Sequence, residues 1–399
     1  MARKKPWIVV AGGGTAGHVL PALAVAESLR SQGVPSDDML FVGSQRGIEN
    51  RLVPEAGFPI VLLPGRGIQR AFRLSNLRNL LALGAAFLRA FVLLARSRPA
   101  VVLSVGGYAS VPCAFSAVAL RIPLVLAESN AKAGMANRSV ARFAKATATA
   151  FGSTGLPRAS VVGNPVRSSV AELGASLDPS QHGSTARASS RHDLGVPVDA
   201  QMVSVFGGSL GARRINATVF ELCERWVDRP IVIHHVVGER DADAGSQWLA
   251  TFRDRHRHAV LDYRQIRYEN RMDLVYGASD LVVCRAGATS IADLATVGMP
   301  AILIPLPSAA EDHQSANAAA VATDGACVHL PEKELSVERL ASEIDALLND
   351  HDRMRSMADA QRRRARPNAA FDVTAILAAH ASRPMPHNGA ASANGLGKR

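Results

Sequence analysis

The sequence predicts an α/β protein built from two Rossmann-like domains that face each other across a cleft. Three observations lead to this fold class. The 399 residues exceed what one hydrophobic core usually supports, short apolar runs alternate with helical patterns, and each half opens with a strand, a glycine turn and a helix. We expect the first domain at residues 1–163, the second at 164–368, a helix at 369–381 that packs back on the first domain, and a disordered tail at 382–399.

The first half begins with an apolar strand at 7–11, followed by the glycine turn GGGTAGH at 12–18 and a helix. Such a turn lets backbone N–H groups and a helix N-terminus approach a phosphate or another anion. Its glycines satisfy GxGxxG, so a nicotinamide or flavin dehydrogenase has to be considered. The second strand, at 39–42, ends in Gly43-Ser44-Gln45 without the carboxylate that holds an adenosine ribose, which disfavours a dinucleotide.

The second half repeats this start, with a strand at 202–206 and the turn GGSLGA at 207–212. Before it, the polar stretch at 175–191 is expected to be a flexible loop. Apolar runs predict further strands at 231–235 and 259–261, and helical spacing predicts helices at 337–348, 353–363 and 373–379.

The segment at 281–318 carries the densest site chemistry of the chain. It is predicted to form a strand at 281–284, a turn at 285–290, a helix from about Ile291, a strand at 300–305 and a helix near His313. Ligands of parallel α/β sheets bind beyond the carboxyl ends of the strands, where both polar clusters of this segment fall. The segment therefore predicts half of a binding cleft.

Two further strands of the first half also end in glycine or polar turns, as Gly106-Gly107-Tyr108 and as Glu128-Ser129-Asn130, and a strand at 159–162 leads into the turn at 163–167. His18 is either a hydrogen-bonding residue at a helix N-terminus or a neutral imidazole that acts as a general base on a hydroxyl. Glu128 is either a general base or acceptor-orienting group, or an N-cap or loop carboxylate.

The composition of the chain limits the classes of partner that it is expected to bind. A formal net charge of +11 and a pI near 10.1 indicate an anionic partner, which can be nucleic acid, a phosphorylated ligand or an acidic membrane surface. With 5% aromatic residues and no nucleic-acid-binding motif, nucleic acid is disfavoured. The four cysteines are far apart and form no CxxC, which favours a reducing cytosol over disulfides or structural zinc. Four histidines at 234, 235, 256 and 258 lack metal-ligand spacing, so no metal is expected.

No uncharged apolar run reaches the roughly 18 residues of a membrane span, and the N-terminus is predicted to be a strand rather than a signal peptide. The stretch at 66–91 mixes arginines with leucines and phenylalanines. Most of it is expected to be a core-facing helix, but an exposed subset ringed by Arg70, Arg73 and Arg78 would suit an anionic membrane surface.

Several motifs together resemble one family. GGGTAGHVLPALAVA, SVGGYAS, the GNPVR turn, FGGSLGA, and CRAGATSIADLATVGMPAILIPLP followed by HQSANA match, in order and spacing, the bacterial lipid II-forming N-acetylglucosaminyltransferase (MurG) family. The match runs from about Trp7 to Ala379. The resemblance implies a GT-B fold and an inverting transfer of GlcNAc from UDP-GlcNAc to the C4 hydroxyl of undecaprenyl-pyrophosphoryl-MurNAc-pentapeptide (lipid I), for peptidoglycan synthesis.

The resemblance also assigns residues. It implies His18 or Glu128 as the base, and an acceptor site and a UDP-GlcNAc site with no cofactor. It further implies a peripheral position at the cytoplasmic face of the cell membrane. Cell-wall synthesis proteins are further partners compatible with it. The acceptor residues are Thr15, Gly107, Tyr108 and Asn130, and the donor residues are Thr15, Gly17, Asn130, Arg167, Ser209, Ile266, Ala288, Thr289, Asp293 and Gln314.

Two departures from the family pattern affect these sites. The family usually has Glu where this chain has Asp293, and the shorter side chain has less reach toward the uridine ribose. Ala127 and Ser129 stand where many relatives have His and Gln. Two alternatives share the two-domain plan: a UDP-sugar 2-epimerase, and a non-catalytic membrane-associated scaffold.

Overall fold

The computed structural model describes residues 5–45, 47–64, 75–177, 185–208, 211–307 and 309–386, with side chains for all of these except 75–82 and 310. Ser209, Arg70 and Arg73, the side chain of Arg78, and positions 387–399 of the expected tail lie outside this description. The chain forms two compact units. The first comprises Met1–Ser129, Ala133–Pro165 and Asn368–Arg399, and the second comprises Asn130–Lys132 and Val166–Pro367.

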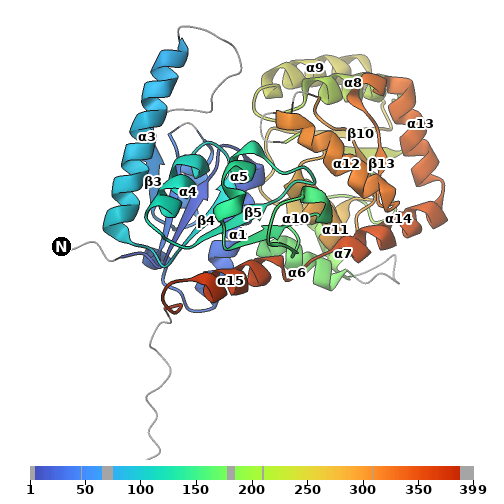
Figure 1. The fold of residues 1–399 in the computed structure, drawn as a ribbon. Coiled ribbons are helices and arrows are strands. Elements are labelled where there is room, and N and C mark those ends of the chain that lie inside the picture. The colour runs from blue at the N-terminus through green and yellow to red at the C-terminus, as the bar shows by residue number, and fades with distance from the viewer. Residues whose placement is uncertain are drawn as a thin grey trace, which may run out of the picture. The chain divides into compact units, whose positions relative to one another are not determined.

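The first unit contains a parallel sheet of seven strands in the order β3-β2-β1-β4-β5-β6-β7. Strands β3, β4 and β5 of this sheet are labelled in Figure 1. The order reverses at β1 and β4, which makes the carboxyl ends of these strands the switch point of a doubly wound sheet. The strands are β1 (Ile8–Gly12), β2 (Met39–Ser44), β3 (Ile60–Leu63), β4 (Val101–Gly106), β5 (Leu124–Glu128), β6 (Ala146–Thr149) and β7 (Ala159–Val161).

Helices cover both faces of this sheet, which is why its strands are continuous apolar runs. Along β1, Ile8 and Val10 join one core with α1, α2 and α15, whereas Val9 and Ala11 join a second core with α3, α4 and α5. The helices are α1 (Ala16–Ser31), α2 (Glu49–Glu55), α3 (Ser75–Ser97), α4 (Ser110–Ala119), α5 (Met135–Val140) and α15 (Ala369–His380).

The C-terminal helix α15 returns to the first unit, where it packs against α1. Thr374 Oγ1 accepts a hydrogen bond from Gln32 Nε2 at 2.8 Å, and Val373 and Leu377 are buried in the same core as Trp7. Beyond the helix, Ser382 N donates to Ala100 O at 2.9 Å. The chain that follows α15 therefore remains attached to the first unit.

The second unit has a parallel sheet of six strands in the order β10-β9-β8-β11-β12-β13. Its strands are β8 (Gln201–Phe206), β9 (Ile231–Val236), β10 (Asp262–Ile266), β11 (Leu281–Cys284), β12 (Ala301–Leu303) and β13 (Val328–His329). Its helices are α6 (Ser168–Ser176), α7 (Thr185–Asp193), α8 (Arg213–Arg225), α9 (Ala242–Arg255), α10 (Met272–Ala278), α11 (Ala288–Val297), α12 (His313–Thr323), α13 (Val337–Leu348) and α14 (His351–Arg364).

Short 3-10 turns complete both units, at Ser36–Asp38, Ala141–Phe143, Gly152–Thr154, Ala310–Asp312 and Glu332–Glu334. The two Rossmann-like domains predicted from the repeated strand, glycine turn and helix are confirmed, since each unit is a parallel sheet covered by helices. Among the described helices, none combines the length and the apolar character that crossing a bilayer requires.

The strand predicted at 259–261 is wrong, because β10 lies at Asp262–Ile266. As an edge strand it buries one of its five side chains: Tyr263 is 5% exposed, while its neighbours Arg264 and Gln265 are partly exposed. The apolar run at 259–261 that suggested a strand precedes it and contains Val260, which is 54% exposed. Apolar runs identify central strands better than such an edge strand.

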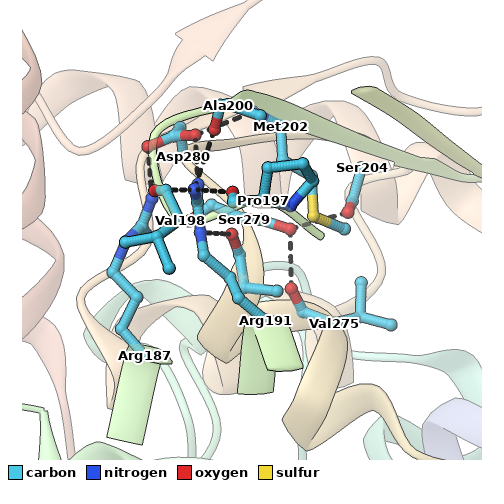
Figure 2. Close-up of polar contacts among 11 residues, drawn as sticks. Arg187, Arg191, Pro197, Val198, Ala200, Met202, Ser204, Val275, Ser279 and Asp280 are labelled. Atoms are coloured by element: carbon cyan, nitrogen blue, oxygen red, sulfur yellow. Dashed lines mark hydrogen bonds and ion pairs between the residues drawn. The ribbon is translucent and has the colours of Figure 1, made fainter. Parts of the chain in front are cut away.

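The prediction of a flexible loop at 175–191 is also wrong for residues 185–191. There, α7 begins at Thr185, and Arg191 is 2% exposed. The guanidinium of Arg191 donates to the carbonyls of Ala278 and Ala200 at 3.1 and 2.8 Å, and to Asp280 Oδ2 at 2.9 Å (Figure 2). Burial and the neighbouring Arg187 lower the pKa of Arg191, and Asp280 opposes this effect.

This arginine network explains why a polar segment is ordered. Arg187 contacts the other carboxylate oxygen of Asp280 at 2.5 Å, and Asp280 Oδ2 also accepts the N–H of Met202 at 2.8 Å, so the network ties α7 to the start of β8 (Figure 2). Serine, threonine and arginine are typical of loops when solvated. Here, hydrogen bonds to buried partners replace that solvation.

Candidate active site

Two glycine turns of the first unit, after β1 and β4, lie in contact. A Cβ on Gly12 would lie 2.4 Å from Gly106 O, and one on Gly107 would lie 2.3 Å from Gly13 O. All four residues have positive φ, between 83° and 145°. The close approach therefore requires glycine in both turns, and it places the start of α1 beside the end of β4.

His18 lies in the first turn of α1 and is partly buried. Its Nδ1 is 3.2 Å from Thr15 Oγ1, and Thr15 is the N-cap residue, with the extended backbone typical of that position. A Cβ on Gly106 would lie 3.1 Å from His18 Nε2, so this nitrogen faces the second glycine turn. Gly17 lies in the same helical turn, and a Cβ there would lie 3.7 Å from Thr15 Oγ1.

Glu128, the last residue of β5, is 5% exposed. Its Oε2 accepts hydrogen bonds from Gly134 N and from Asn137 Nδ2, both at 3.0 Å. Asn137, itself 2% exposed, also donates to Ala127 O and accepts from Ser104 Oγ at 3.1 Å. Asn137 therefore joins the ends of β4 and β5 through a side chain that motif spacing had not marked.

Tyr108 follows the second glycine turn, but its hydroxyl is engaged, since it donates to Pro64 O at 3.1 Å. Burial raises the pKa of this phenol. The structure thus brings Thr15, His18, Gly107 and Glu128 to one edge of the first sheet and directs the Tyr108 hydroxyl toward the end of β3.

In the second unit the glycine turn after β8 packs against the loop after β9. A Cβ on Gly211 would lie 2.5 Å from Val237 O. Behind it, His235 is fully buried between Asn216 and Tyr263, with 3.0 Å contacts to each. Burial, assisted by His234, lowers the pKa of His235 to about 3, so it is a neutral core histidine. Among the described residues no cluster of His, Cys, Asp and Glu that could hold a metal ion is found.

The turn between β11 and α11 is fixed by Arg285, which is 7% exposed. Arg285 Nη1 donates to the carbonyls of Ile304 and Pro305 at 3.2 and 3.1 Å, and its Nη2 forms an ion pair with Glu332. This contact joins the ends of β11 and β12. Helix α11 then begins at Ala288 with Gly287 as N-cap, and the hydroxyl of Thr289 is buried without a hydrogen-bond partner among the described residues.

Asp293, one turn into α11, is 4% exposed. Its Oδ2 accepts from Tyr276 Oη at 3.3 Å, while Oδ1 has no hydrogen-bond partner among the described residues. Burial raises the pKa of Asp293 to about 7, against the lowering effects of Arg167 and of the Tyr276 hydrogen bond. Arg167 is the N-cap residue of α6, and its Nη1 lies 3.4 Å from Asn270 O. A buried oxygen without a partner is a ready acceptor for a ligand hydroxyl.

Helix α12 supplies the remaining polar groups. Gln314 Oε1 accepts from Leu306 N at 2.9 Å. Asn317, fully buried, contacts Asn130 Oδ1 at 3.1 Å and accepts from Ala131 N at 2.8 Å. Asn130 therefore groups with the donor-side residues. Ile266 ends β10 and is partly exposed.

The predicted site residues that the structure describes thus form two groups, one at the carboxyl edge of the first sheet and one at the carboxyl edge of the second. Sequence reasoning missed Asn137, Tyr276 and Asn317, whose partners lie 9 to 187 positions away along the chain. No local motif could have revealed these contacts.

Comparisons with known proteins agree with this architecture. Residues 8–149 match the glycosyltransferase family 28 N-terminal domain, and residues 202–373 match its C-terminal domain. The chain is 40% identical, over 92% of its length and 97% of the relative, to a UDP-N-acetylglucosamine–N-acetylmuramyl-(pentapeptide) pyrophosphoryl-undecaprenol N-acetylglucosamine transferase from Alkalilimnicola ehrlichii. A transferase of the same name from Carboxydothermus hydrogenoformans is 35% identical, over 93% of this chain and 97% of the relative.

Solved structures give the same result. Acinetobacter baumannii MurG superposes with a TM-score of 0.69 at 27% identity, covering 93% of this chain and 98% of that one. A UDP-GlcNAc 2-epimerase from Neisseria meningitidis reaches a TM-score of 0.63 over 93% and 99% of the two chains, at only 12% identity, so its likeness is one of fold alone. By both of its domains and by these relatives, the chain belongs to glycosyltransferase family 28, among the N-acetylmuramyl-(pentapeptide) pyrophosphoryl-undecaprenol N-acetylglucosamine transferases.

Proposed function

We propose that this chain transfers GlcNAc from UDP-GlcNAc to the C4 hydroxyl of undecaprenyl-pyrophosphoryl-MurNAc-pentapeptide, giving the disaccharide lipid used in peptidoglycan synthesis. The observation that carries the proposal is identity of 40% over 92% of the chain to a transferase named for these substrates. The glycine turns and the polar residues after β1, β4 and β11 support it, because they are the groups such a transfer requires.

The reaction forms one bond and breaks one. The acceptor O4 attacks C1 of GlcNAc from the face opposite the diphosphate, the C1–O bond to UDP breaks, and the anomeric centre inverts. The proton of the acceptor hydroxyl passes to a base, and UDP leaves with the bonding electron pair.

His18 is the base we favour. Its imidazole is only partly buried, and its Nε2 faces the glycine turn after β4. Glu128 is the weaker candidate, because its carboxylate is buried and already accepts hydrogen bonds from Gly134 and Asn137. We assign Glu128 to holding Asn137 and the adjoining loop, and Thr15, Gly107, Tyr108 and Asn130 to the acceptor side.

The donor site is assigned to the second unit. The N-terminus of α11, at Ala288 and Thr289, and the guanidinium of Arg167 stabilise the charge that develops on the departing diphosphate. Asp293 accepts from the ribose hydroxyls, and Gln314 binds the GlcNAc moiety. Further donor contacts are assigned to Thr15, Gly17, Asn130, Ser209 and Ile266.

A transfer assay tests the proposal. We expect radiolabelled GlcNAc to pass from UDP-GlcNAc to a lipid I analogue at the same rate with and without a chelator. UDP-GlcNAc converted without any lipid acceptor would instead indicate an epimerase. No turnover, together with no rise in melting temperature on adding UDP, would favour a non-catalytic scaffold.

The chain is proposed to act as a peripheral protein on the cytoplasmic face of the cell membrane, where an undecaprenol-linked substrate resides, with cell-wall synthesis proteins as further partners. Helix α3 supports this. Its inner side buries Ala90 and Leu94, yet Leu88 and Phe91 on its outer side are 65% and 42% exposed, beside the exposed Arg89. Apolar side chains ringed by cations suit an anionic bilayer surface.

Replacing Leu88 and Phe91 together by glutamate should lower binding to vesicles of anionic phospholipid by about tenfold or more. Each change removes an apolar side chain that would insert into the bilayer, and each adds a negative charge that the anionic headgroups repel. Co-sedimentation at low and high salt measures the effect. The control is Phe371→Glu on α15, where a 56% exposed phenylalanine carries no role in the proposal. Equal loss in both variants would count against α3 as the membrane-binding surface.

A further inference from the structure

Glu49, the first residue of α2, is a buried carboxylate that no part of the proposed reaction uses. It is 2% exposed. Its Oε2 accepts the N–H of Gly14 at 2.7 Å, and its Oε1 accepts the N–H and the hydroxyl of Ser44 at 2.7 and 3.0 Å. Both carboxylate oxygens are therefore bound by the protein itself, and one of them binds the glycine turn that precedes Thr15 and His18.

The surroundings of Glu49 are shaped for this carboxylate. A Cβ on Gly13 would lie 2.4 Å from Glu49 Cδ, one on Gly43 would lie 2.4 Å from its Cγ, and one on Gly47 would lie 2.0 Å from its Oε2. None of these overlaps could be relieved without moving the carboxylate away from its donors. Glycines from the first turn, the end of β2 and the segment before α2 therefore all make room for one side chain.

The contact between Glu49 and Gly14 changes which group the first glycine turn binds. Backbone N–H groups in such turns commonly bind a phosphate oxygen of a ligand. Here the N–H of Gly14 is taken by an internal carboxylate, 35 residues away in sequence. The carboxylate that reaches the end of β2 comes from α2, and it holds the turn instead of facing outward for a ribose.

We infer that Glu49 is a positioning residue for the transfer reaction: its carboxylate fixes the turn at Gly12–Gly14 against β2, and through that turn it sets the positions of Thr15 and His18. This inference rests on the proposed role of His18. The link is short, because Gly14 directly precedes Thr15, and Thr15 Oγ1 contacts the His18 imidazole. Hydrogen bonds to a charged, buried acceptor are strong, and misplacement of a reacting group by about 1 Å can cost about 100-fold in rate.

Glu49→Gln tests the inference because it keeps the size of the side chain and removes the second acceptor oxygen. One N–H of the pair Gly14 and Ser44 then faces an amide NH₂ group. We expect kcat for GlcNAc transfer to fall by about 10- to 100-fold. The KM for UDP-GlcNAc should stay within about twofold, because the groups assigned to the diphosphate, the ribose and the GlcNAc moiety all belong to the second unit. We also expect faster amide hydrogen exchange at residues 13–18 in the chain without substrates.

The control is Glu55→Gln on the same helix, where an exposed carboxylate pairs with Arg51; its kcat and exchange should match the parent chain. If Glu49→Gln yields too little folded protein, Glu49→Asp carries the test, since the shorter carboxylate can serve only one of its two partners. An unchanged kcat would overturn the inference. So would a fall explained by the fraction of folded protein, or a loss of activity confined to a raised KM for UDP-GlcNAc.

The two readouts separate this inference from the proposed function. Hydrogen exchange needs no lipid acceptor, so a parent chain that transfers no GlcNAc would count against the proposed function and not against the contact between Glu49 and the turn. An active parent chain with unchanged exchange at residues 13–18 in Glu49→Gln would count against the positioning role alone.

Discussion

Replacing His18 by alanine is expected to lower kcat for GlcNAc transfer by about 10²- to 10⁴-fold, the range that general base catalysis supplies. The affinity for UDP-GlcNAc should change little, because the groups assigned to the diphosphate and the ribose, on α11 and at Arg167, belong to the second unit and do not include His18. Steady-state kinetics with a lipid I analogue, together with calorimetric titration of UDP-GlcNAc, measures the two quantities separately.

The matched control is His192→Ala, whose side chain is 90% exposed on α7 and has no assigned role, so kcat should not change. Glu128→Gln distinguishes the two candidate bases. If Glu128 only holds Asn137 and the loop at 134, its replacement should cost less in kcat than the loss of His18. A loss confined to KM in His18→Ala would remove His18 from the chemical step.

Replacing Asp293 by asparagine is expected to stabilise the free protein at alkaline pH while weakening donor binding. In the folded chain burial raises the pKa of Asp293 to about 7, from its ordinary value of 3.8. Between these values the folded state retains a proton that the unfolded state releases, so stability falls as pH rises through the window from about 4 to 7. Above pH 7 the charged form costs on the order of a few kcal/mol.

Asparagine avoids that cost. At pH 8 we expect Asp293→Asn to raise the free energy of unfolding by about 1–3 kcal/mol, as measured by urea denaturation, and to weaken UDP-GlcNAc binding by about tenfold or more through loss of a charged acceptor. The gain in stability should disappear near pH 4, where the parent aspartate is protonated in the folded state.

Donor affinity should also depend on pH through this carboxyl group. If the ionised form accepts from the ribose hydroxyls, UDP-GlcNAc binds more tightly as pH rises from 6 to 8, and Asp293→Asn removes this dependence. Tyr276→Phe should move the transition to higher pH, because the Tyr276 hydrogen bond lowers the pKa of Asp293. A parent Kd that stays flat over this range would contradict the assignment of Asp293 to the ribose.

Local sequence patterns were sufficient for the framework of the fold. Glycine turns after apolar strands marked the starts of both Rossmann-like units, and helical spacing placed α13 at Val337–Leu348. Patterns failed where an element is polar but ordered. Helix α7 has the composition of a loop, and the carbonyls that order it through Arg191 come from elsewhere in the chain. Strand β10 lacks a continuous apolar run because it is an edge strand.

The sequence by itself determined the two parallel sheets, the turns at their carboxyl edges and the family, because these follow from apolar runs, helical periodicity and glycines spaced along a continuous segment. Only the tertiary structure decided what those turns contact: Glu49 on Gly14, Asn137 on Glu128 and Tyr276 on Asp293. The physical reason is that a buried polar group takes its partner from whichever segment the fold brings within hydrogen-bonding distance, and that distance has no counterpart in sequence spacing.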